Sequence, residues 1–233
     1  MQTYIVVGVS TGIGFELVNL LLKQGKKVIG IGRNNSVTNA CYKFISLDLS
    51  KAKDVEEFDF PKITEPFAFI YNAGTLGHIA AFEEQEIENA PHVMQVNFLS
   101  ATTLTHKVLR NNLCQQIQYI SSGAANKAIP SWSQYCASKA ALNIFAETLQ
   151  LELRAASKNC NIYSIAPGVV DTPMQASIRN CSEKDFPQVK QFQNMFENQE
   201  LKSPSEIAQK LYSVLENPNE FPAVCLSLRD IRH

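Results

Sequence analysis

The sequence predicts one α/β domain built on a doubly wound, mostly parallel sheet. Short runs rich in Val and Ile alternate with longer stretches of helical periodicity, and a glycine-rich turn follows the first run. No linker rich in Pro, Gly or Ser divides the 233 residues. Runs of this kind are typical of strands buried on both faces, which right-handed helical crossovers join into a parallel sheet. Because this length suits one large core, we expect a single domain over residues 1–233.

Six apolar runs are the expected strands, and helical stretches separate them. The first run ends at a glycine, and apolar residues then follow at helical spacing from Ile13 to Leu21. The longest expected helices cover Glu86–Leu113, with Pro91 as a candidate break, and Ser133–Lys158. The expected strands are Tyr4–Val7, Lys27–Ile31, Tyr42–Leu47, Phe67–Tyr71, Ile117–Ser121 and Asn161–Ile165.

Composition and charge exclude several classes of protein. The formal net charge is −1 and charged residues make up 18 %, so nothing favours nucleic acid or an anionic membrane as a partner. No apolar stretch approaches the roughly 18 residues of a membrane span. The first apolar run has no basic segment before it, unlike a signal peptide. We therefore expect a cytoplasmic protein.

The six cysteines predict neither a metal site nor a disulfide. They lie far apart, form no Cys-x-x-Cys pair and have no histidine interleaved among them at ligand spacing. We expect reduced, mostly buried thiols in a reducing compartment. The histidines also lack ligand spacing, and we expect them at the surface or at helix ends: His78, His92, His106 and His233.

The turn after the first expected strand suits a pyrophosphate. Glycines there permit a tight turn, close backbone approach to phosphate and close helix–strand packing. The helix that follows offers free N–H groups to the anion. The spacing Gly-x-x-x-Gly-x-Gly departs from the commoner dinucleotide fingerprint, so a plain strand–helix turn is the alternative. Its place at the first strand–helix junction favours a dinucleotide, with these candidate binding residues: Gly8, Ser10, Thr11, Gly12, Ile13 and Gly14.

The end of the second expected strand favours NADP(H) over NAD(H). An acidic residue at this place would bind the ribose 2′-hydroxyl of NAD and repel the 2′-phosphate of NADP. The sequence has no carboxylate over Gly30–Asn34 and offers the guanidinium of Arg33, which suits a phosphate, beside Asn34. The alternative is a solvated Arg33 next to an NAD site.

A serine, a tyrosine and a lysine form the strongest candidate site. Tyr135 and Lys139 are four residues apart near the start of a long expected helix, so their side chains share one face. Such a pair arises easily by chance. Ser122 stands 13 positions before Tyr135, directly after the fifth expected strand, and this second spacing makes the joint pattern far more specific. The alternative is a set of satisfied polar groups at the edge of the core.

Further motifs complete the pattern in order along the chain. They are Asp48-Leu49, Asn72-Ala73-Gly74, Asn97 and a run that contributes Pro167, Gly168, Val170 and Thr172. With the glycine turn and the Ser122/Tyr135/Lys139 set, they resemble the short-chain dehydrogenase/reductase family over nearly the whole chain. Within this family, the chain is most similar to sepiapterin-reductase-like and carbonyl-reductase-like members. The resemblance implies a three-layer Rossmann fold with a seven-stranded sheet.

The resemblance also implies roles for these motifs. Asp48, followed by Leu49, would contact the adenine, Asn72-Ala73-Gly74 would line the cofactor cleft, and the run Pro167–Thr172 would hold the nicotinamide end. Lys139 would also bind the nicotinamide ribose. Asn97 would anchor a water that connects Lys139 to solvent.

The chemistry these residues support is the interconversion of a carbonyl and an alcohol by hydride transfer. A phenol has an ordinary pKa near 10, which makes it a poor acid at neutral pH unless a neighbouring ammonium stabilises the phenolate. Tyr135 is the expected general acid/base, Lys139 the ammonium, and Ser122 the group that holds the substrate oxygen. The substrate is a small molecule. The alternative function is a catalytically quiet NADP-binding redox sensor or regulatory protein, which would not need the intact set.

Two further expectations concern the lid and the assembly. Residues 174–203 lie where the family carries a variable substrate lid, and we expect them to cover the site and to be more mobile than the sheet. Trp132 either walls the substrate pocket or fills a helix interface. The segment Pro222–Leu228 replaces the glycine-rich ending through which many family tetramers pack. We therefore expect a homodimer through the two long helices, with a monomer as the alternative.

Overall fold

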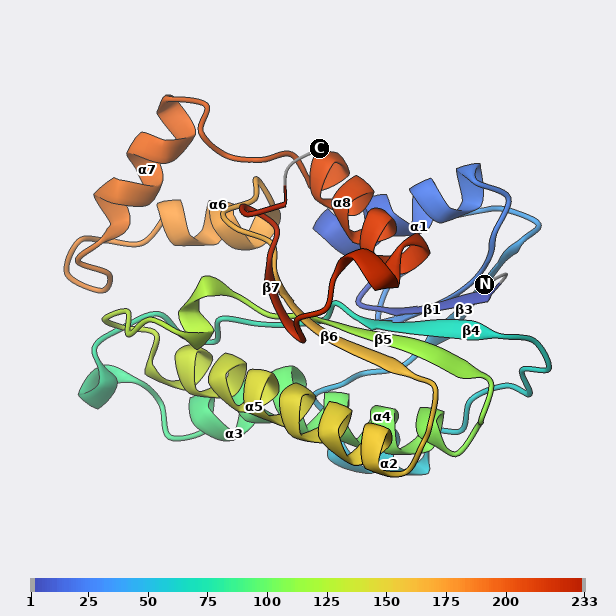
Figure 1. The fold of residues 1–233 in the computed structure, drawn as a ribbon. Coiled ribbons are helices and arrows are strands. Elements are labelled where there is room, and N and C mark those ends of the chain that lie inside the picture. Colours follow the sequence, from blue (N-terminus) through green and yellow to red (C-terminus); the bar gives the residue numbers. More distant parts are fainter. Residues whose placement is uncertain (1–2, 232–233) are drawn as a thin grey trace.

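The computed structural model describes residues 3–231, which form a seven-stranded sheet with every pair of neighbouring strands parallel (Figure 1). The strand order is β3-β2-β1-β4-β5-β6-β7. The predicted α/β fold is therefore confirmed, and the sheet is wholly rather than mostly parallel. The strands are β1 (Thr3–Val7), β2 (Lys27–Gly32), β3 (Tyr42–Ser46), β4 (Phe67–Tyr71), β5 (Cys114–Ile120), β6 (Asn161–Ala166) and β7 (Cys225–Ser227).

Helices cover both faces of the sheet and give the molecule three layers. Figure 1 shows α1 and α8 above the sheet and α2, α4 and α5 below it. The helices α6 and α7 lie beyond one end of the sheet, on the side of α8. The helices are α1 (Gly12–Lys23), α2 (Ala52–Glu57), α3 (Asn89–Met94), α4 (Ser100–Leu109), α5 (Ser133–Ala155), α6 (Pro173–Arg179), α7 (Val189–Glu197) and α8 (Pro204–Glu216).

The core divides along the two faces of the central strand β1. Val6 packs in a cluster with Leu17 of α1 and Leu211 of α8, whereas its neighbour Val7 packs in a second cluster with Leu142 of α5. Successive side chains of a strand point to opposite faces, so an unbroken apolar run serves both clusters. This arrangement explains why the strand shows no polar alternation in the sequence.

The expected helix over Glu86–Leu113 differs from the structure in its start, its interruption and its end, since α4 ends at Leu109. It begins at Asn89, and the predicted break at Pro91 is wrong because this proline lies in the first turn, where its missing N–H costs nothing. The irregularity is instead a π-helical segment, Gln95–Leu99, between α3 and α4. Such π segments are rare and frequent at functional sites.

The six cysteines differ in their exposure. The prediction of mostly buried cysteines is wrong: Cys114 and Cys160 are buried, Cys41 is exposed and the other three are half-buried. All six are free thiols.

Between residues 3 and 231 there is no group of His, Cys, Asp or Glu arranged to hold a metal ion, and His233 lies outside the described residues. Within the same range, no helix has the length and apolar character needed to cross a membrane.

Candidate active site

The glycine turn lies where the strand order of the sheet reverses. Strands β1 and β4 are neighbours there, and the carboxyl ends of parallel strands at such a switch point form a crevice in doubly wound folds. Gly8 has φ +87°, and a Cβ on it would lie 2.6 Å from the backbone nitrogen of Ala73. A Cβ on Gly14 would overlap the carbonyl oxygen of Gly8, which accepts a hydrogen bond of 2.6 Å from the Asn72 side chain. Only glycine fits these two positions.

A cavity of about 850 Å³ opens from this turn along the carboxyl edge of the sheet. This volume is within the range of ligand sites in proteins. Most of the predicted site residues line it. They are Gly8, Ser10, Thr11, Gly12, Ile13, Arg33, Asp48, Leu49, Asn72, Ala73, Gly74, Ser122, Tyr135, Lys139, Pro167, Gly168, Val170 and Thr172.

Three predicted residues do not line the cavity. Gly14 lies beneath the turn, against Gly8 and Asn72. Asn34 accepts a hydrogen bond of 3.0 Å at its main-chain oxygen from the Ser10 hydroxyl, which ties the glycine turn to the end of β2. Asn97 is fully buried behind Gly74. Gly14 and Asn97 thus lie behind the cavity wall, and Asn34 holds the glycine turn from an exposed position.

Ser122, Tyr135 and Lys139 meet on one wall of the cavity. Ser122 follows β5, and its hydroxyl accepts a hydrogen bond of 3.1 Å from the backbone N–H of Ala124. Tyr135 and Lys139 lie in the first two turns of α5, and the Lys139 Nζ lies 5.8 Å from the centre of the Tyr135 ring. The structure therefore brings the three residues together as their spacing predicts.

Burial dominates the protonation of this set. It raises the pKa of the Tyr135 phenol, and a hydrogen bond with the Ser122 hydroxyl opposes part of that rise. Burial also lowers the pKa of Lys139 to about 8. The Lys139 ammonium donates a hydrogen bond of 2.7 Å to the carbonyl of Ile120, not to the phenol. In this arrangement the phenol pKa is raised, which differs from the lowering expected from Lys139.

Asn97 fixes the loop after β4 with its side-chain amide. Its Nδ2 donates to the carbonyl of Thr75 and to the Ser138 hydroxyl, both at 2.9 Å, and its Oδ1 accepts from the Thr75 N–H at 2.8 Å. A Cβ on Gly74 would lie 3.4 Å from the Lys139 Nζ and 3.5 Å from the Asn97 Oδ1. Lys139 and Asn97 therefore face the same small polar niche, which the absent side chain of Gly74 leaves open.

At the opposite end of the cavity, a cation and a carboxylate lie near each other. Arg33 follows β2 and is exposed, whereas Asp48 follows β3 and is half-buried. The Asp48 carboxylate accepts hydrogen bonds from the Ser50 hydroxyl at 2.8 Å and from the Ser50 N–H at 3.1 Å. These hydrogen bonds, with a smaller contribution from Arg33, hold the pKa of Asp48 below its usual value. The Asp48 carboxylate is thus hydrogen-bonded to Ser50, whereas the Arg33 guanidinium is exposed.

An aromatic cluster closes the end of the cavity next to Tyr135. Trp132 is 6 % exposed, stacks on Phe186 with 5.2 Å between ring centres and meets Tyr135 edge to face at 5.6 Å. It both walls the cavity and fills the interface between α5 and the segment that carries α6 and α7, so its two predicted roles coincide. That segment contributes Met174, Gln175, Ile178, Gln188, Gln191, Phe192 and Met195 to the lining.

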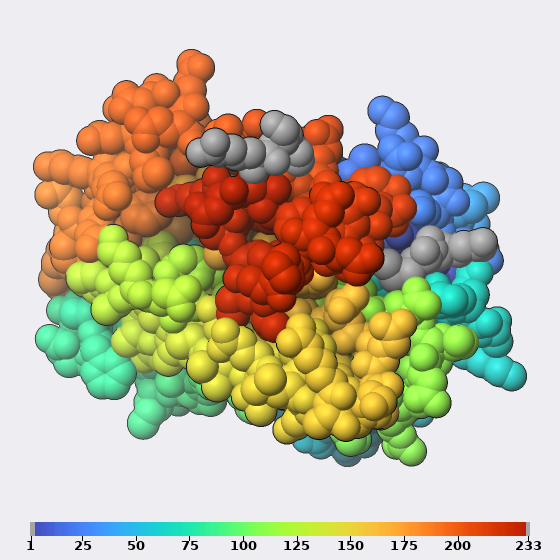
Figure 2. Space-filling model, viewed as in Figure 1, coloured from blue at the N-terminus to red at the C-terminus, as the bar shows by residue number. Residues whose placement is uncertain are grey.

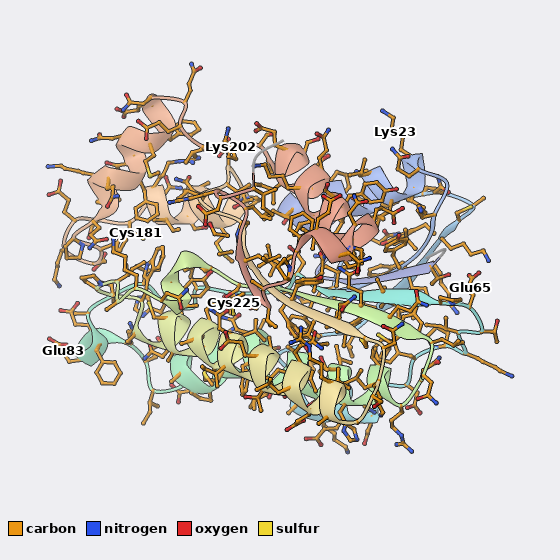
Figure 3. All side chains as sticks on the ribbon, in the orientation of Figure 1. Lys23, Glu65, Glu83, Cys181, Lys202 and Cys225 are labelled. Carbon is orange, nitrogen blue, oxygen red and sulfur yellow. The ribbon has the colours of Figure 1, made fainter. Side chains whose placement is uncertain are left out.

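The segment 174–203 lies over the end of the molecule that holds Trp132, and several of its residues line the cavity. In Figure 2 it sits directly above the yellow-green residues near 130. Figure 3 shows its Cys181 at the same end as Glu83 of the short η1 turn (Phe82–Glu84). An exposed ion pair of 3.3 Å between Lys184 and Glu84 connects the two.

The segment after α8 was missing from the predicted site. β7 and the residues that follow it in the sequence contribute to the cavity lining: Cys225, Leu226, Ser227, Arg229 and Asp230. The available signal was the short apolar run from Val224 to Leu228. A run this short after a proline is weak evidence for a strand.

The reversal in strand order, the bare glycine turn and the Ser/Tyr/Lys wall together define a nicotinamide-dinucleotide-binding oxidoreductase of the Rossmann type. Residues 2–183 match the family described as short chain dehydrogenase. The chain belongs to the short-chain dehydrogenase/reductase family, and this membership implies a nicotinamide cofactor.

Two Bacillus relatives that match nearly the whole chain are named benzil reductases. The chain is 30 % identical over 236 residues to a benzil reductase ((S)-benzoin forming) of Bacillus subtilis, covering 94 % of this chain and 96 % of the relative. It is 31 % identical over 242 residues to the Bacillus cereus enzyme of the same description, covering 95 % and 96 %. The crystal structure of a Saccharomyces cerevisiae short-chain dehydrogenase/reductase matches with a TM-score of 0.84 at 26 % identity, covering 99 % and 97 %. A particular likeness to sepiapterin reductases stays a prediction.

Proposed function

We propose that this protein is an NADP(H)-dependent reductase of bulky apolar ketones, with aromatic diketones as the first substrates to test. One observation carries the proposal: Tyr135 lies between the aromatic residue Trp132 and the cation Lys139 on a single cavity wall. A flat apolar substrate held against Trp132 and Phe192 would present its carbonyl to Tyr135 and Ser122. The names of the Bacillus relatives support the same substrate class.

The cavity fits a dinucleotide on physical grounds. The turn Gly8–Gly14 presents backbone at positions where a Cβ would clash, and the N-terminus of α1 follows it. When bound, the reduced nicotinamide supplies a hydride to the carbonyl carbon. Ser122 holds the carbonyl oxygen by a hydrogen bond, and Tyr135 transfers its phenolic proton to that oxygen as negative charge develops.

Lys139 and Asn97 have supporting roles in this proposal. The Lys139 ammonium stabilises the phenolate that remains on Tyr135 after proton transfer. The niche at Gly74, which both Lys139 and Asn97 face, provides a polar space for a water that returns the proton. Because both amide hydrogens of Asn97 are already bonded within the protein, such a water would use an oxygen of Asn97 as its acceptor.

The preference for NADP(H) rests on Arg33. No carboxylate follows β2, and the Arg33 guanidinium is exposed at the cavity edge, where it can bind a 2′-phosphate. Asp48 follows β3 and not β2, so it does not stand at the place where an acidic residue would bind the ribose 2′-hydroxyl. An NADH preference in the wild-type protein would overturn this part of the proposal.

We further propose that residues 174–203 act as a mobile lid and that the protein forms a homodimer. The lid residues line the substrate end of the cavity.

The dimer proposal rests on exposed apolar side chains. On the outer face of α5, Ile144 and Leu151 are 64 % and 65 % exposed, and Leu99 beside α4 is also exposed. An apolar stripe of this kind on two long helices suits an isologous contact. A cytoplasmic location and one domain over residues 1–233 stay predictions.

The test measures cofactor oxidation with benzil, other diketones and simple ketones, using NADPH and NADH in parallel. Tyr135→Phe should lose at least about 100-fold in kcat, because positioned acid catalysis contributes factors of this size. Its affinity for NADPH should remain close to that of the wild type. Equal turnover by Tyr135→Phe would overturn the mechanism, and absence of turnover with every carbonyl would overturn the assigned reaction.

A further inference from the structure

We propose that Arg229, in the segment after β7, binds the pyrophosphate of the cofactor. The inference rests on the proposed function, because it requires a nicotinamide dinucleotide in the cavity. It adds a residue that none of the motifs contains, from a part of the chain outside the matched family region of residues 2–183. Three independent features of the structure support it.

The first feature is the position of the Arg229 side chain. Gly168 has φ +86°, and a Cβ on it would lie 3.1 Å from the Arg229 Nε and 3.4 Å from its Cγ. The missing side chain of Gly168 therefore leaves the space along which Arg229 extends. The same loop ends at Thr172, whose Cγ2 would lie 3.2 Å from a Cβ on Gly12 of the glycine turn. One short loop thus separates Arg229 from the turn that suits phosphate.

The second feature is the way the backbone holds Arg229 in place. Leu228 is buried, and its N–H donates a hydrogen bond of 3.0 Å to the carbonyl of Ala166. The Lys210 ammonium donates to the carbonyls of Leu228 and Ile231, both at 2.9 Å. The backbone is therefore fixed on both sides of Arg229, which reduces the backbone entropy that this segment loses when Arg229 binds an anion.

The third feature is charge. The turn Gly8–Gly14 carries no cationic side chain, although a pyrophosphate brings two negative charges. Among the described residues that line the cavity, the cations are Arg33, Lys127, Lys139 and Arg229. Lys139 is hydrogen-bonded to the carbonyl of Ile120, and Arg33 stands at the end of β2.

Arg229 has the anion-binding capacity that the site needs. Across residues 3–231 Arg229 forms no ion pair. The two carboxylates of the cavity lining, Asp48 and Asp230, are therefore not paired with it. A guanidinium is planar and presents paired N–H groups, so it suits the oxygens of a phosphate.

The test measures binding directly, without turnover. Trp132 is the only tryptophan of the chain and lines the cavity, so its fluorescence reports NADPH and NADH binding. Arg229→Gln should raise the Kd of both dinucleotides by the same factor, about tenfold, and should weaken the salt dependence of binding. Arg229→Lys should lose less. Arg33→Gln should raise the Kd for NADPH alone, because only NADPH has a 2′-phosphate.

Arg110→Gln is the matched control, since Arg110 is an exposed arginine outside the cavity lining and lies at the end of α4. Its two Kd values should equal those of the wild type, and all variants should share one thermal midpoint without cofactor. Unchanged Kd values for Arg229→Gln, or a loss confined to NADPH, would overturn the inference while leaving the proposed function intact. A wild-type protein that binds neither dinucleotide would overturn both.

Discussion

At the scale of single residues, the most informative group is the buried ammonium of Lys139. Its position beside Tyr135 follows from the four-residue spacing and was predictable. Its partner was not, because the spacing contains no information about the carbonyl of Ile120 on β5, 19 residues earlier. The same limit applies to the phenol of Tyr135, whose pKa depends on burial that only tertiary packing creates.

The lowered pKa of Lys139 predicts a dependence of stability on pH. The folded protein releases this proton at about pH 8, whereas an unfolded lysine holds it to about pH 10.4. Between these values the unfolded state binds more protons, so the contribution of Lys139 to the free energy of unfolding rises with pH. Below pH 8 the destabilising effect of the buried charge is fully present.

Lys139→Met removes this effect, and urea unfolding at pH 7, 8, 9 and 9.5 measures it. The free energy of unfolding of the wild type, relative to the variant, should rise by at most about 1.4 kcal/mol per pH unit above pH 8. The contributions of the cysteines and of the tyrosines remote from Lys139 cancel in the difference. Tyr135 stays protonated in both folded proteins up to pH 9.5, because burial raises its pKa above the ordinary value near 10. Lys23→Met, at an exposed position on α1 (Figure 3), should show no such slope. Parallel curves for Lys139→Met and the wild type would contradict the buried charge.

At the scale of elements, the segment that carries α6 and α7 packs on the rest of the domain through a buried aromatic cluster. Its location over the site was predictable from the family pattern, but its anchoring was not. Phe186 lies outside both helices, in the connection between them, where no periodicity indicates which face is buried. The structure shows Phe186 fully buried against Trp132 and Phe192.

Phe186→Ala should therefore loosen this segment selectively. Removing a buried phenylalanine costs about 3–5 kcal/mol where the site cannot collapse. We expect faster hydrogen exchange over residues 174–203 and a raised KM for an aromatic diketone, with unchanged NADPH affinity. Phe196→Ala is the control in the same segment, because Phe196 is 46 % exposed and contacts the Arg179 guanidinium at 3.8 Å. Similar exchange in both variants would show that the cluster does not anchor the segment.

The strands show where sequence reasoning succeeds and where it fails at this scale. Phe67–Tyr71 was predicted to the residue because its apolar run ends sharply at a proline and at Asn72. β7 was not named, since three residues are too few to show a pattern. The π-helical segment Gln95–Leu99 was also invisible, because a single widened turn barely changes the spacing of apolar residues.

At the scale of the whole molecule, the exposed stripe on α5 predicts self-association. Leu151→Glu would place a carboxylate in an apolar contact between two copies and so favour the monomer. Analytical ultracentrifugation at micromolar concentration should show a dimer for the wild type and a monomer for the variant. Glu152→Gln, on the same exposed helix end, should leave the dimer intact. A wild-type monomer would contradict the predicted dimer.

The fold as a whole was more predictable than any detail of the site. Alternating buried runs and helices determine a parallel sheet with few possible topologies, because crossovers are right-handed and short. The site depends on contacts between segments distant in the sequence, such as Gly168 with Arg229. Local sequence patterns do not indicate such contacts.

The position of Arg229 has a consequence for biosynthesis. The turn Gly8–Gly14 at the cavity is made early, whereas residues 225–230, which also contribute to the lining, leave the ribosome long afterwards. A ligand that binds only the native state stabilises it in proportion to the logarithm of its concentration over Kd. A nascent or truncated chain that lacks Asp230 and the residues before it would receive less of this stabilisation. A nicotinamide cofactor in the cell would then favour survival of chains that have been translated through this segment.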